Sequence, residues 1–209
     1  MIVKVAFSIQ AEVSAVARYG VEHKAETRRR IIEAAGRRLK KDGIDGSGIA
    51  TVMSDADLTN GAFYAHFDSK TDLVARVVSD QLEQQRASIG AIPASREALE
   101  DYIRDYLSVA HRDNYADGCP TAALLAEIGR CDTAVRDAYS KGAQSIVQEI
   151  AAHLPPGRSD ANQIQTALGL FTILVSSLQL ARAITDPALS EQVLSTGVRN
   201  ALRVLDDWE

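Results

Sequence analysis

Helix-breaking residues are scarce in this chain, and no stretch alternates apolar and polar residues for long. Only 5 of the 209 residues are proline. Alanine, leucine, arginine, glutamate and glutamine, which favour helix, are frequent. A half-buried strand needs the alternation that is missing here. We therefore expect an all-α protein, and 46% hydrophobic residues are enough to build a sizeable core.

Basic residues concentrate in the first predicted helix, over about residues 24–41. Apolar residues recur every four positions from Ile31 to Leu39, and Thr27 is a candidate cap. This segment carries a net of six positive charges, whereas residues 71–209 carry a net of seven negative charges. Such a division predicts a DNA-binding head on an acidic body. A run of charge by itself can equally be a solvated helix face.

Two short helices joined by a tight turn are predicted next. Ser47 can cap the first of them, Thr59 can cap the second, and Asp57 stands in the turn between them. Phe63 and Phe67 lie one turn apart on the second helix and should face inward. Two helices in this arrangement form a helix-turn-helix unit.

The opposite face of that second helix carries small or hydrogen-bonding side chains, which would let it enter a major groove. Asn60 can pair with adenine, and Ala62 can contact a thymine methyl group. Tyr64 and His66 can reach phosphates, although packing is an equally ordinary role for either one. Lys70 falls in the first turn of the following helix, where free N–H groups also favour an anion.

Capping and apolar periodicity predict the remaining helices. Ser69 and Asp72 resemble a capping box, and Leu73, Val74 and Val77 begin the apolar face behind it. A loop containing Pro93 follows at 90–95. Further helices are predicted near 96–112, 120–130, 132–154, 159–185 and 187–207.

The run from Thr59 to Lys70 closely resembles the recognition-helix signature of the tetracycline-repressor (TetR) family, and residues 27–35 resemble that family's first helix. The resemblance covers 24–80. It implies an all-α homodimer that binds a palindromic operator in double-stranded DNA and releases it when a small-molecule effector binds. By this resemblance the DNA-binding residues are Thr59, Tyr64, His66 and Lys70 at phosphates and Asn60, Gly61 and Ala62 against bases, with Ser47 as a further candidate.

Two departures from the family pattern are visible. Asp57 stands where the family usually has a turn glycine, and aspartate tolerates left-handed backbone better than most residues. Also, the family's first helix normally begins near the N-terminus, whereas 23 residues precede the predicted first helix of this chain. Residues 1–15 are therefore open to three interpretations: an upstream extension, a wrongly assigned start, or a disordered arm. The predicted division is an extension over 1–23, a helix-turn-helix domain over 24–70, and a regulatory and dimerisation domain over 71–209.

The regulatory domain offers candidates for a dimer interface and for a ligand pocket. The helix over 159–185 is apolar nearly all round and needs cover on two sides. A four-helix interface with a symmetry mate would supply that cover, and a single intramolecular bundle is the alternative. The predicted interface stripe on the last helix is Leu194, Val198, Ala201, Leu202 and Leu205. The candidate pocket residues are Tyr102, Tyr106, Cys119, Tyr139 and Phe171, although such aromatic residues are often plain core.

The two cysteines, Cys119 and Cys131, are too few for a disulfide framework and fit no zinc motif. Pro120 suits the first turn of a helix, which leaves Cys119 at its cap, where the helix dipole makes a thiol more reactive. Residues 118–124 also resemble a segment from one branch of the same family, some of whose members respond to electrophiles or oxidants. A thiol-based sensor is therefore an alternative function, and a buried structural cysteine is the simpler interpretation.

Motifs for catalysis are missing from the sequence. It has four histidines but no metal-binding pattern, no glycine-rich phosphate loop and no nucleophile elbow. An all-α enzyme is thus a remote alternative, and we expect neither a metal nor a cofactor. The N-terminus lacks the apolar core of a signal peptide, and the apolar stretch 168–180 is too short to span a bilayer. We expect a cytoplasmic protein with no membrane partner.

Overall fold

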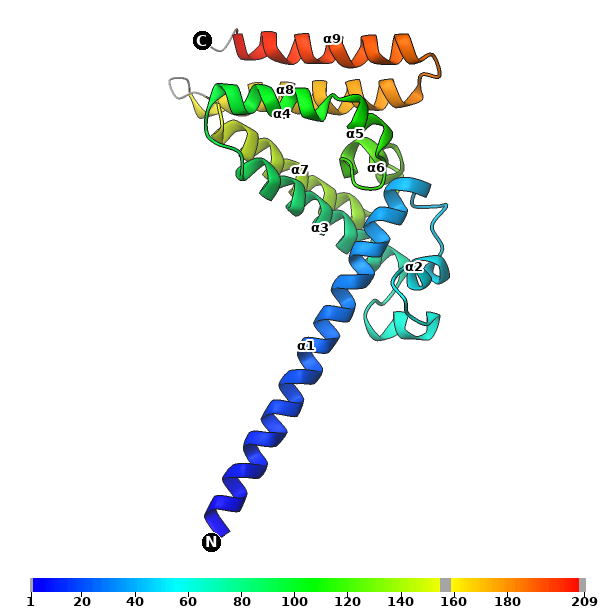
Figure 1. Ribbon diagram of the computed structural model, residues 1–209, viewed down its shortest axis with the longest axis vertical. Coiled ribbons are helices and arrows are strands. Elements are labelled where there is room, and N and C mark those ends of the chain that lie inside the picture. Colours follow the sequence, from blue (N-terminus) through cyan, green and yellow to red (C-terminus); the bar gives the residue numbers. More distant parts are fainter. Residues whose placement is uncertain (1, 155–158, 207–209) are drawn as a thin grey trace.

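The computed structural model describes residues 2–154 and 159–206, and within these ranges it contains helices and no strands, which confirms the all-α prediction. The chain forms an N-terminal group of short helices at the end of a long helix, and a larger body of longer helices (Figure 1). The helices are α1 (Ile2–Asp42), α2 (Ile49–Asp55), η1 (Asn60–Ala65), α3 (Lys70–Gly90), α4 (Arg96–Tyr106), α5 (Val109–Asp113), α6 (Pro120–Ile128), α7 (Thr133–Ala152), α8 (Asp160–Ala183) and α9 (Pro187–Asp206).

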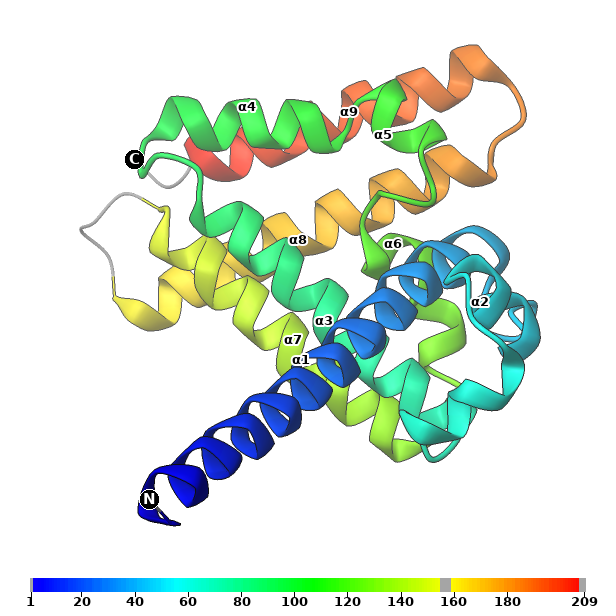
Figure 2. The ribbon, with the colours of Figure 1, turned by 60° about the horizontal axis from the view of Figure 1, so that its bottom comes forward.

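Helix α1 is much longer than the sequence predicts. It runs for 41 residues from Ile2, and its N-terminal half projects away from the rest of the molecule (Figure 1; Figure 2). The predicted start near residue 24 is wrong, because the preceding segment has no proline and Gly20 alone does not stop a helix. Thr27 is accordingly not a cap but a buried residue in the middle of the helix.

The helix-turn-helix unit packs against the C-terminal part of α1. Its core contains fully buried Phe63 and Phe67, as predicted, with their rings stacked 5.6 Å apart between centroids. The element that carries Phe63 is not an α-helix but a six-residue 3₁₀ helix, η1. Asn60 and Gly61 favour helix poorly, and so short a segment cannot sustain one without tertiary support. Thr59 precedes η1, but its side chain makes no capping hydrogen bond.

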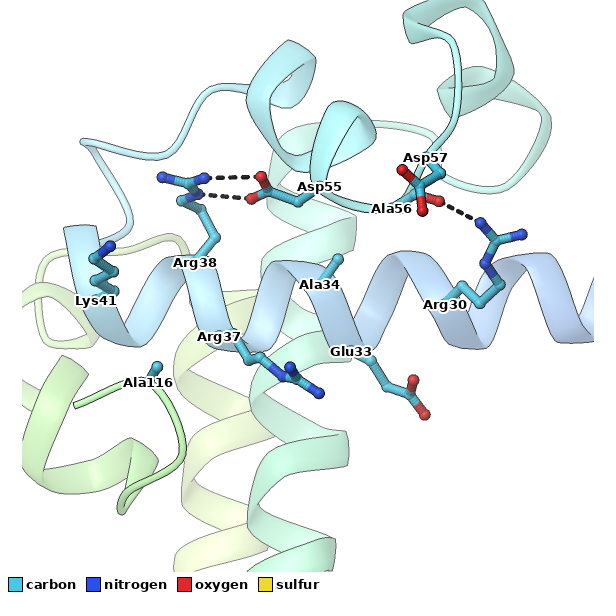
Figure 3. Close-up of a pocket in the computed structure, with 10 residues that line it drawn as sticks. All are labelled: Arg30, Glu33, Ala34, Arg37, Arg38, Lys41, Asp55, Ala56, Asp57 and Ala116. Carbon is cyan, nitrogen blue, oxygen red and sulfur yellow. Dashed lines mark hydrogen bonds and ion pairs between the residues drawn. The ribbon is translucent and has the colours of Figure 1, made fainter. Parts of the chain in front are cut away.

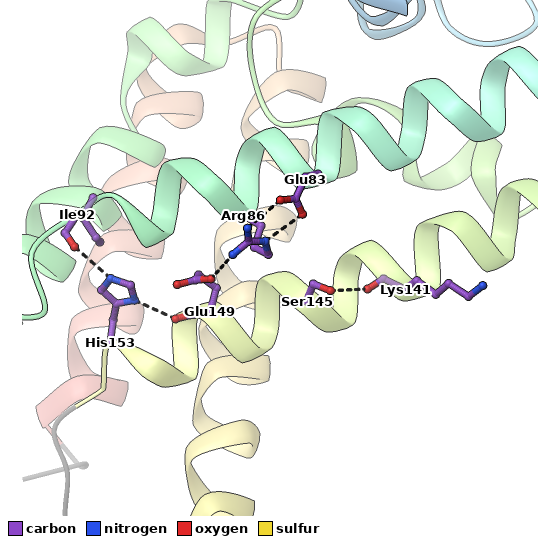
Figure 4. Close-up of polar contacts among 7 residues, drawn as sticks. All are labelled: Glu83, Arg86, Ile92, Lys141, Ser145, Glu149 and His153. Atoms are coloured by element: carbon purple, nitrogen blue, oxygen red, sulfur yellow. Dashed lines mark hydrogen bonds and ion pairs between the residues drawn. The ribbon is translucent and has the colours of Figure 1, made fainter.

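Helix α3 joins the head to the body and pairs with α7. The Ser69 side chain accepts from the Asp72 backbone N–H, which confirms the predicted cap, and the predicted apolar face of α3 is buried. The two helices approach closely at Gly142, where an added Cβ would lie 2.5 Å from Leu82 Cδ1. Arg86 on α3 also bridges Glu83 and Glu149, with Nη–Oε distances of 2.7 and 2.6 Å (Figure 4).

The predicted helix over 96–112 is divided in two. α4 ends at Tyr106, and Ser108 caps the separate helix α5 by accepting from the His111 backbone N–H. Serine is a preferred N-cap residue, so Ser108 explains why a new helix begins here. Apolar periodicity alone gave no sign of it.

Helices α8 and α9 pack against each other at the far side of the body (Figure 1). Gly197 makes this approach possible, because an added Cβ there would lie 2.6 Å from Ser177 Oγ. Three residues of the predicted interface stripe on α9, Leu194, Ala201 and Leu205, are buried within this chain, while Val198 and Leu202 are half-buried. These residues face the α8 and α4 side rather than standing open to a partner.

Helix α8 is longer than its apolar stretch suggests. It has 24 residues, and its most apolar 18-residue window has a mean hydropathy of 1.6, so it could cross a membrane by length and composition alone, contrary to the prediction from the stretch 168–180. Leu170, Leu174 and Leu178 nevertheless form a buried face, as in the core helix of a globular protein. Leu168 and Leu180 lie on the exposed face, at 52% and 55% exposure.

Candidate nucleic-acid interface and regulatory cavities

The residues predicted to meet DNA are gathered on and beside η1. Thr59, Asn60, Gly61 and Tyr64 are exposed, Tyr64 at 71%, while Phe63 behind them is fully buried. Tyrosine is enriched at interfaces relative to the rest of a protein surface, so an exposed ring at this place suits a contact surface. Ala62, His66 and Lys70 are half-buried at the edges of the same face.

The turn before η1 depends on Asp57, whose φ of 55° lies in the left-handed region. The backbone N–H groups of Asp57 and Leu58 donate to the Ser54 and Met53 carbonyl oxygens, at 3.0 and 2.9 Å, and so close the turn. The prediction that aspartate replaces glycine in a left-handed turn is thereby confirmed. Aspartate is among the few residues with a side chain that adopt this conformation readily.

His66 lies between this surface and the cations of α1. Burial and the nearby Lys24 and Arg28 lower its pKa below the ordinary value, so the ring is neutral at physiological pH. Its Nδ1 atom is buried and has no hydrogen-bond partner among the described residues. Arg28 itself lies over the Phe67 ring, 4.6 Å from the centroid, and thereby joins α1 to the helix-turn-helix core.

Ser47 does not lie on this surface. The side chain is 1% exposed, and its hydroxyl donates to the Gly43 carbonyl at 2.6 Å. Gly48, not Ser47, precedes α2 as its cap. Ser47 therefore closes the loop between α1 and α2 and is not accessible to a phosphate.

Much of the basic charge on α1 is engaged inside the head. Figure 3 shows Arg38 paired with both carboxylate oxygens of Asp55, at 2.7 and 2.8 Å, and Arg30 donating to the Ala56 carbonyl at 2.6 Å. These side chains border a cleft of about 370 Å³ between α1 and α2. Here the basic run orients α2 against α1, so its charge alone is a poor guide to DNA contact.

The predicted pocket residues line two cavities rather than one. Tyr139 and Phe171 belong to a mainly apolar cavity of about 600 Å³ between α6, α7 and α8. Tyr102, Tyr106 and Cys119 belong to a second cavity of about 240 Å³, whose wall includes several glutamine side chains of α3. The sequence could not separate the two sets, because all five residues fall on predicted helices of the same domain.

Cys119 caps α6, as the sequence predicts. Its sulfur accepts from the Ala122 N–H at 3.5 Å and donates to Gln85 Oε1 at 3.5 Å, and the side chain is 5% exposed. The Cys119 backbone N–H donates to His111 Nε2 at 3.0 Å. Burial, together with the cations Arg182 and Lys40, lowers the pKa of His111, and the ring accepts this bond in its neutral form.

Helix α6 also contacts the helix-turn-helix head. The Glu127 carboxylate accepts from the backbone N–H groups of Ile44 and Asp45, at 2.7 and 3.1 Å, in the loop after α1. Gly43 in this loop has a φ of +80°, and an added Cβ would lie 2.8 Å from Glu127 Oε1. The role of Glu127 was not predictable, because one glutamate in an ordinary helix carries no signal of a partner 83 residues away.

Comparisons with known proteins agree with this architecture. A family model described as "Bacterial regulatory proteins, tetR family" matches residues 31–77, and one described as "Tetracyclin repressor-like, C-terminal domain" matches 95–196. Together they cover more than two thirds of the chain. Both fall on the structural parts described above, the head and the body.

Several sequence relatives are bacterial regulators. The chain is 34% identical over 79 residues to the probable HTH-type transcriptional regulator ArpR of Pseudomonas putida, a match that covers 38% of this chain and 37% of ArpR. It is 21% identical over 140 residues to the HTH-type transcriptional repressor NemR of Escherichia coli, covering 65% and 70%. The match to ArpR thus spans little more than a third of that relative's length.

Solved structures show the same fold. The reduced form of E. coli NemR matches with a TM-score of 0.71 and 18% identity, covering 84% of this chain and 95% of that one. A TetR-family regulator from Agrobacterium tumefaciens matches with a TM-score of 0.65 and 20% identity, covering 85% and 98%. At these identities the likeness concerns the fold alone.

Proposed function

The chain belongs to the tetR family of bacterial regulatory proteins, and from this premise we propose that it is a homodimeric repressor that leaves a palindromic operator when an effector binds its body. The relatives are DNA-binding regulators, which agrees with the expected class and not with an enzyme. The observation that carries the proposal is the exposed face of η1, Thr59 to Tyr64, held on a buried Phe63–Phe67 core. A cytoplasmic location follows from this function.

DNA binding by this face can be tested with two substitutions that should act differently. Lys70→Ala removes a phosphate contact and should weaken binding to all sequences similarly, with the salt slope smaller by about one. Asn60→Ala removes a base contact and should change which sequence is preferred, at a cost of about 1–3 kcal/mol on the best site. Sequence selection from a random duplex pool, followed by anisotropy titration at several salt concentrations, measures both effects.

Lys141→Ala is the matched control, because Lys141 is an exposed lysine on α7 in the body (Figure 4). It should leave affinity and sequence preference unchanged. Binding that is insensitive to salt, or a preference for single strands, would contradict the proposed mode.

We assign the effector to the apolar cavity between α6, α7 and α8. Its volume of about 600 Å³ suits a small molecule, and its wall combines Tyr139, Phe171 and Val147 with a few amide and hydroxyl groups. α6 lines this cavity through Thr121 and Leu125 and holds the head through Glu127. A ligand that displaces α6 can therefore change the position of the head, provided that it binds the two states unequally.

Ala143→Phe should fill this cavity, because Ala143 lies in its wall. We expect the variant to lose binding of the apolar dye Nile red, followed by dye fluorescence, while it keeps operator affinity. Ala152→Phe, on an exposed position of the same helix, is the control and should bind the dye as the parent does. Equal dye binding by all three proteins would place the effector elsewhere.

A thiol-based switch is the second candidate function. It is favoured by the position of Cys119, which caps α6 and lines a cavity, so that an adduct would disturb the helix that holds the head. The similar E. coli structure is described as a reduced form. If Cys119→Ser stays bound to the operator under a mild electrophile that releases the parent, this function is supported; if both release on adding the effector, the thiol is structural.

A further inference from the structure

The second cavity, beside Cys119, differs in character from the effector cavity. It measures about 240 Å³, and its wall is rich in hydrogen-bonding groups contributed by α1, α3, α4 and the loop before α6. The wall includes Lys40, Tyr102, Tyr106, Gln81 and Gln85. So many polar groups around one small cavity indicate a polar ligand rather than an apolar one.

Lys40 is a buried cation in that wall without a counter-ion. The residue is 7% exposed, and its Nζ donates to the Gly118 carbonyl at 3.2 Å. No ion pair joins it to a carboxylate in the described part of the chain. Asp117 also lines the cavity, but its carboxylate pairs with Arg37 and is 63% exposed. Burial accordingly lowers the pKa of Lys40. Buried lysines are rare unless a negative charge compensates them.

Arg182 adds a second positive charge near this cavity, behind the His111 backbone and over the Tyr115 ring. Its Nε and Nη2 donate to the Arg112 and His111 carbonyls at 3.0 Å each, while Nη1 is buried without a partner among the described residues. Burial lowers its pKa. Its bond to the His111 carbonyl places Arg182 next to a residue of the cavity wall, so its positive charge lies close to the cavity.

Tyr106 supplies an unused donor. The residue is 6% exposed, and within the described ranges its hydroxyl has no well-formed hydrogen bond, its polar neighbour being the Cys119 thiol. Burial raises the pKa of Tyr106 well above its ordinary value, so the hydroxyl keeps its proton and can donate it. The Tyr106 ring is fixed by the Tyr102 and His111 rings, with centroids 6.0 and 4.7 Å away.

From these features we propose that the cavity beside Cys119 is a second ligand site, which takes a small monocarboxylic acid as its anion. The carboxylate accepts from the Lys40 ammonium and the Tyr106 hydroxyl, and the cavity wall surrounds the rest of the molecule. One cation and one neutral hydroxyl in the same cavity wall match a single negative charge with two acceptor oxygens. Arg182 adds favourable potential without needing to touch the ligand.

Such a ligand would act on the DNA-binding head directly. Lys40 stands near the C-terminal end of α1, and its bond to the Gly118 carbonyl is a contact between head and body. A carboxylate would compete with that carbonyl for Lys40. The site therefore differs from the apolar cavity both in ligand class and in the route by which it reaches the head.

Calorimetric titration of the purified full-length protein with benzoate, and with its neutral counterpart benzamide, tests this inference without DNA. Benzoate should bind in the millimolar range or tighter, and benzamide should bind at least tenfold more weakly. Lys40→Met and Tyr106→Phe should each weaken benzoate binding about tenfold or more, as loss of a hydrogen bond to a charged group does. Lys141→Met, an exposed lysine replaced in the same way, should not change it.

The two cysteines locate the ligand. Cys119 lines this cavity, whereas Cys131 lies elsewhere, near Lys70 and Glu127. Benzoate should slow alkylation of Cys119 by iodoacetamide and leave the rate at Cys131 unchanged, as quantified by mass spectrometry. Tyr106→Phe loses a single oxygen atom, so it serves if Lys40→Met does not fold.

The inference is overturned if benzoate fails to bind, if benzamide binds equally well, or if benzoate does not protect Cys119. None of these outcomes touches the proposed operator binding, which is measured separately. Loss of operator binding would likewise leave the carboxylate site intact.

Discussion

Two hydrogen bonds hold the His111 ring in one protonation state. Its Nε2 accepts from the Cys119 N–H, and its Nδ1 lies 2.7 Å from the Tyr106 carbonyl, which requires the neutral ring with its proton on Nδ1. Protonation of Nε2 would set a donor against a donor. The lowered pKa of His111, caused chiefly by burial, agrees with this arrangement.

We predict that His111 makes the protein less stable in mild acid. In the unfolded chain the ring takes up a proton as the pH falls through about 6.5, whereas the folded protein resists protonation until a lower pH. The free energy of unfolding should therefore be constant above about pH 6.5 and should decrease as the pH falls below that value. Urea unfolding from about pH 8 to about pH 5 should reveal the decline, and His111→Gln should make it shallower. His66, whose pKa is also lowered, stays in the variant and accounts for a remaining slope.

Single residues were predicted well where a local rule governed them. Asp57 in its left-handed turn, Cys119 and Ser69 at helix caps, and buried Phe63 all follow from their own positions in the sequence. Ser47 did not, because its hydroxyl binds a carbonyl four residues back rather than the helix that follows it. A serine hydroxyl can bind either a preceding carbonyl or a backbone N–H of the following helix, and the local sequence does not determine which.

Among the elements, α3 and α7 form the central pair of the body, and Gly142 sets their separation. An alanine Cβ there would lie 2.7 Å from Leu82 Cβ, an atom that cannot rotate away. We predict that Gly142→Ala destabilises the protein by about 1–3 kcal/mol despite the better helix propensity of alanine. Gly169→Ala, in α8 with open space around it, should instead be neutral or stabilising by up to about 1 kcal/mol. Chemical denaturation of both variants measures the contrast, and equal stabilities would show that the helices separate freely.

Helix positions in the body were largely predictable, since α6, α7, α8 and α9 each begin within a residue or so of the expected start. The misses have physical causes. α1 continues through 22 residues where no breaker stops it, α4 breaks at a serine cap, and η1 is a short segment whose Asn60 and Gly61 favour an α-helix poorly. Periodicity reports which face of a helix is buried, but not where hydrogen bonding stops.

For the whole molecule, the exposed leucines of α8 and α9 are the best candidates for the dimer interface. Leu180 and Leu189 are 55% and 47% exposed and border one groove between the two helices. The interface predicted on α9 includes Leu194, Ala201 and Leu205, which are buried within this chain, because an apolar stripe looks alike whether it meets its own core or a partner. Only the packing of α8 and α4 against α9 shows which residues of the stripe face the chain's own core.

We predict that Leu180→Glu or Leu189→Glu converts the dimer to a folded monomer, because a charge at a dry interface is costly while an exposed position in the monomer tolerates it. Sedimentation velocity measures the state, and circular dichroism confirms that the helices persist. Val109→Glu, at a comparably exposed position on α5, is the control and should remain dimeric. A dimer that survives both α8 and α9 substitutions would place the interface on another surface.

The hydrogen bonds between Glu127 and the loop after α1 can couple effector binding to operator affinity. Two backbone N–H groups donate to this one carboxylate, and each such charge-assisted bond contributes about 1.5–3 kcal/mol. An effector that breaks both in the released state would change operator affinity by roughly a hundred- to ten-thousand-fold, since about 1.4 kcal/mol corresponds to a factor of ten. Linkage makes this reciprocal, so operator DNA must weaken the effector by the same factor. If the effector acts through Glu127, Glu127→Gln should narrow the range over which the effector changes operator affinity.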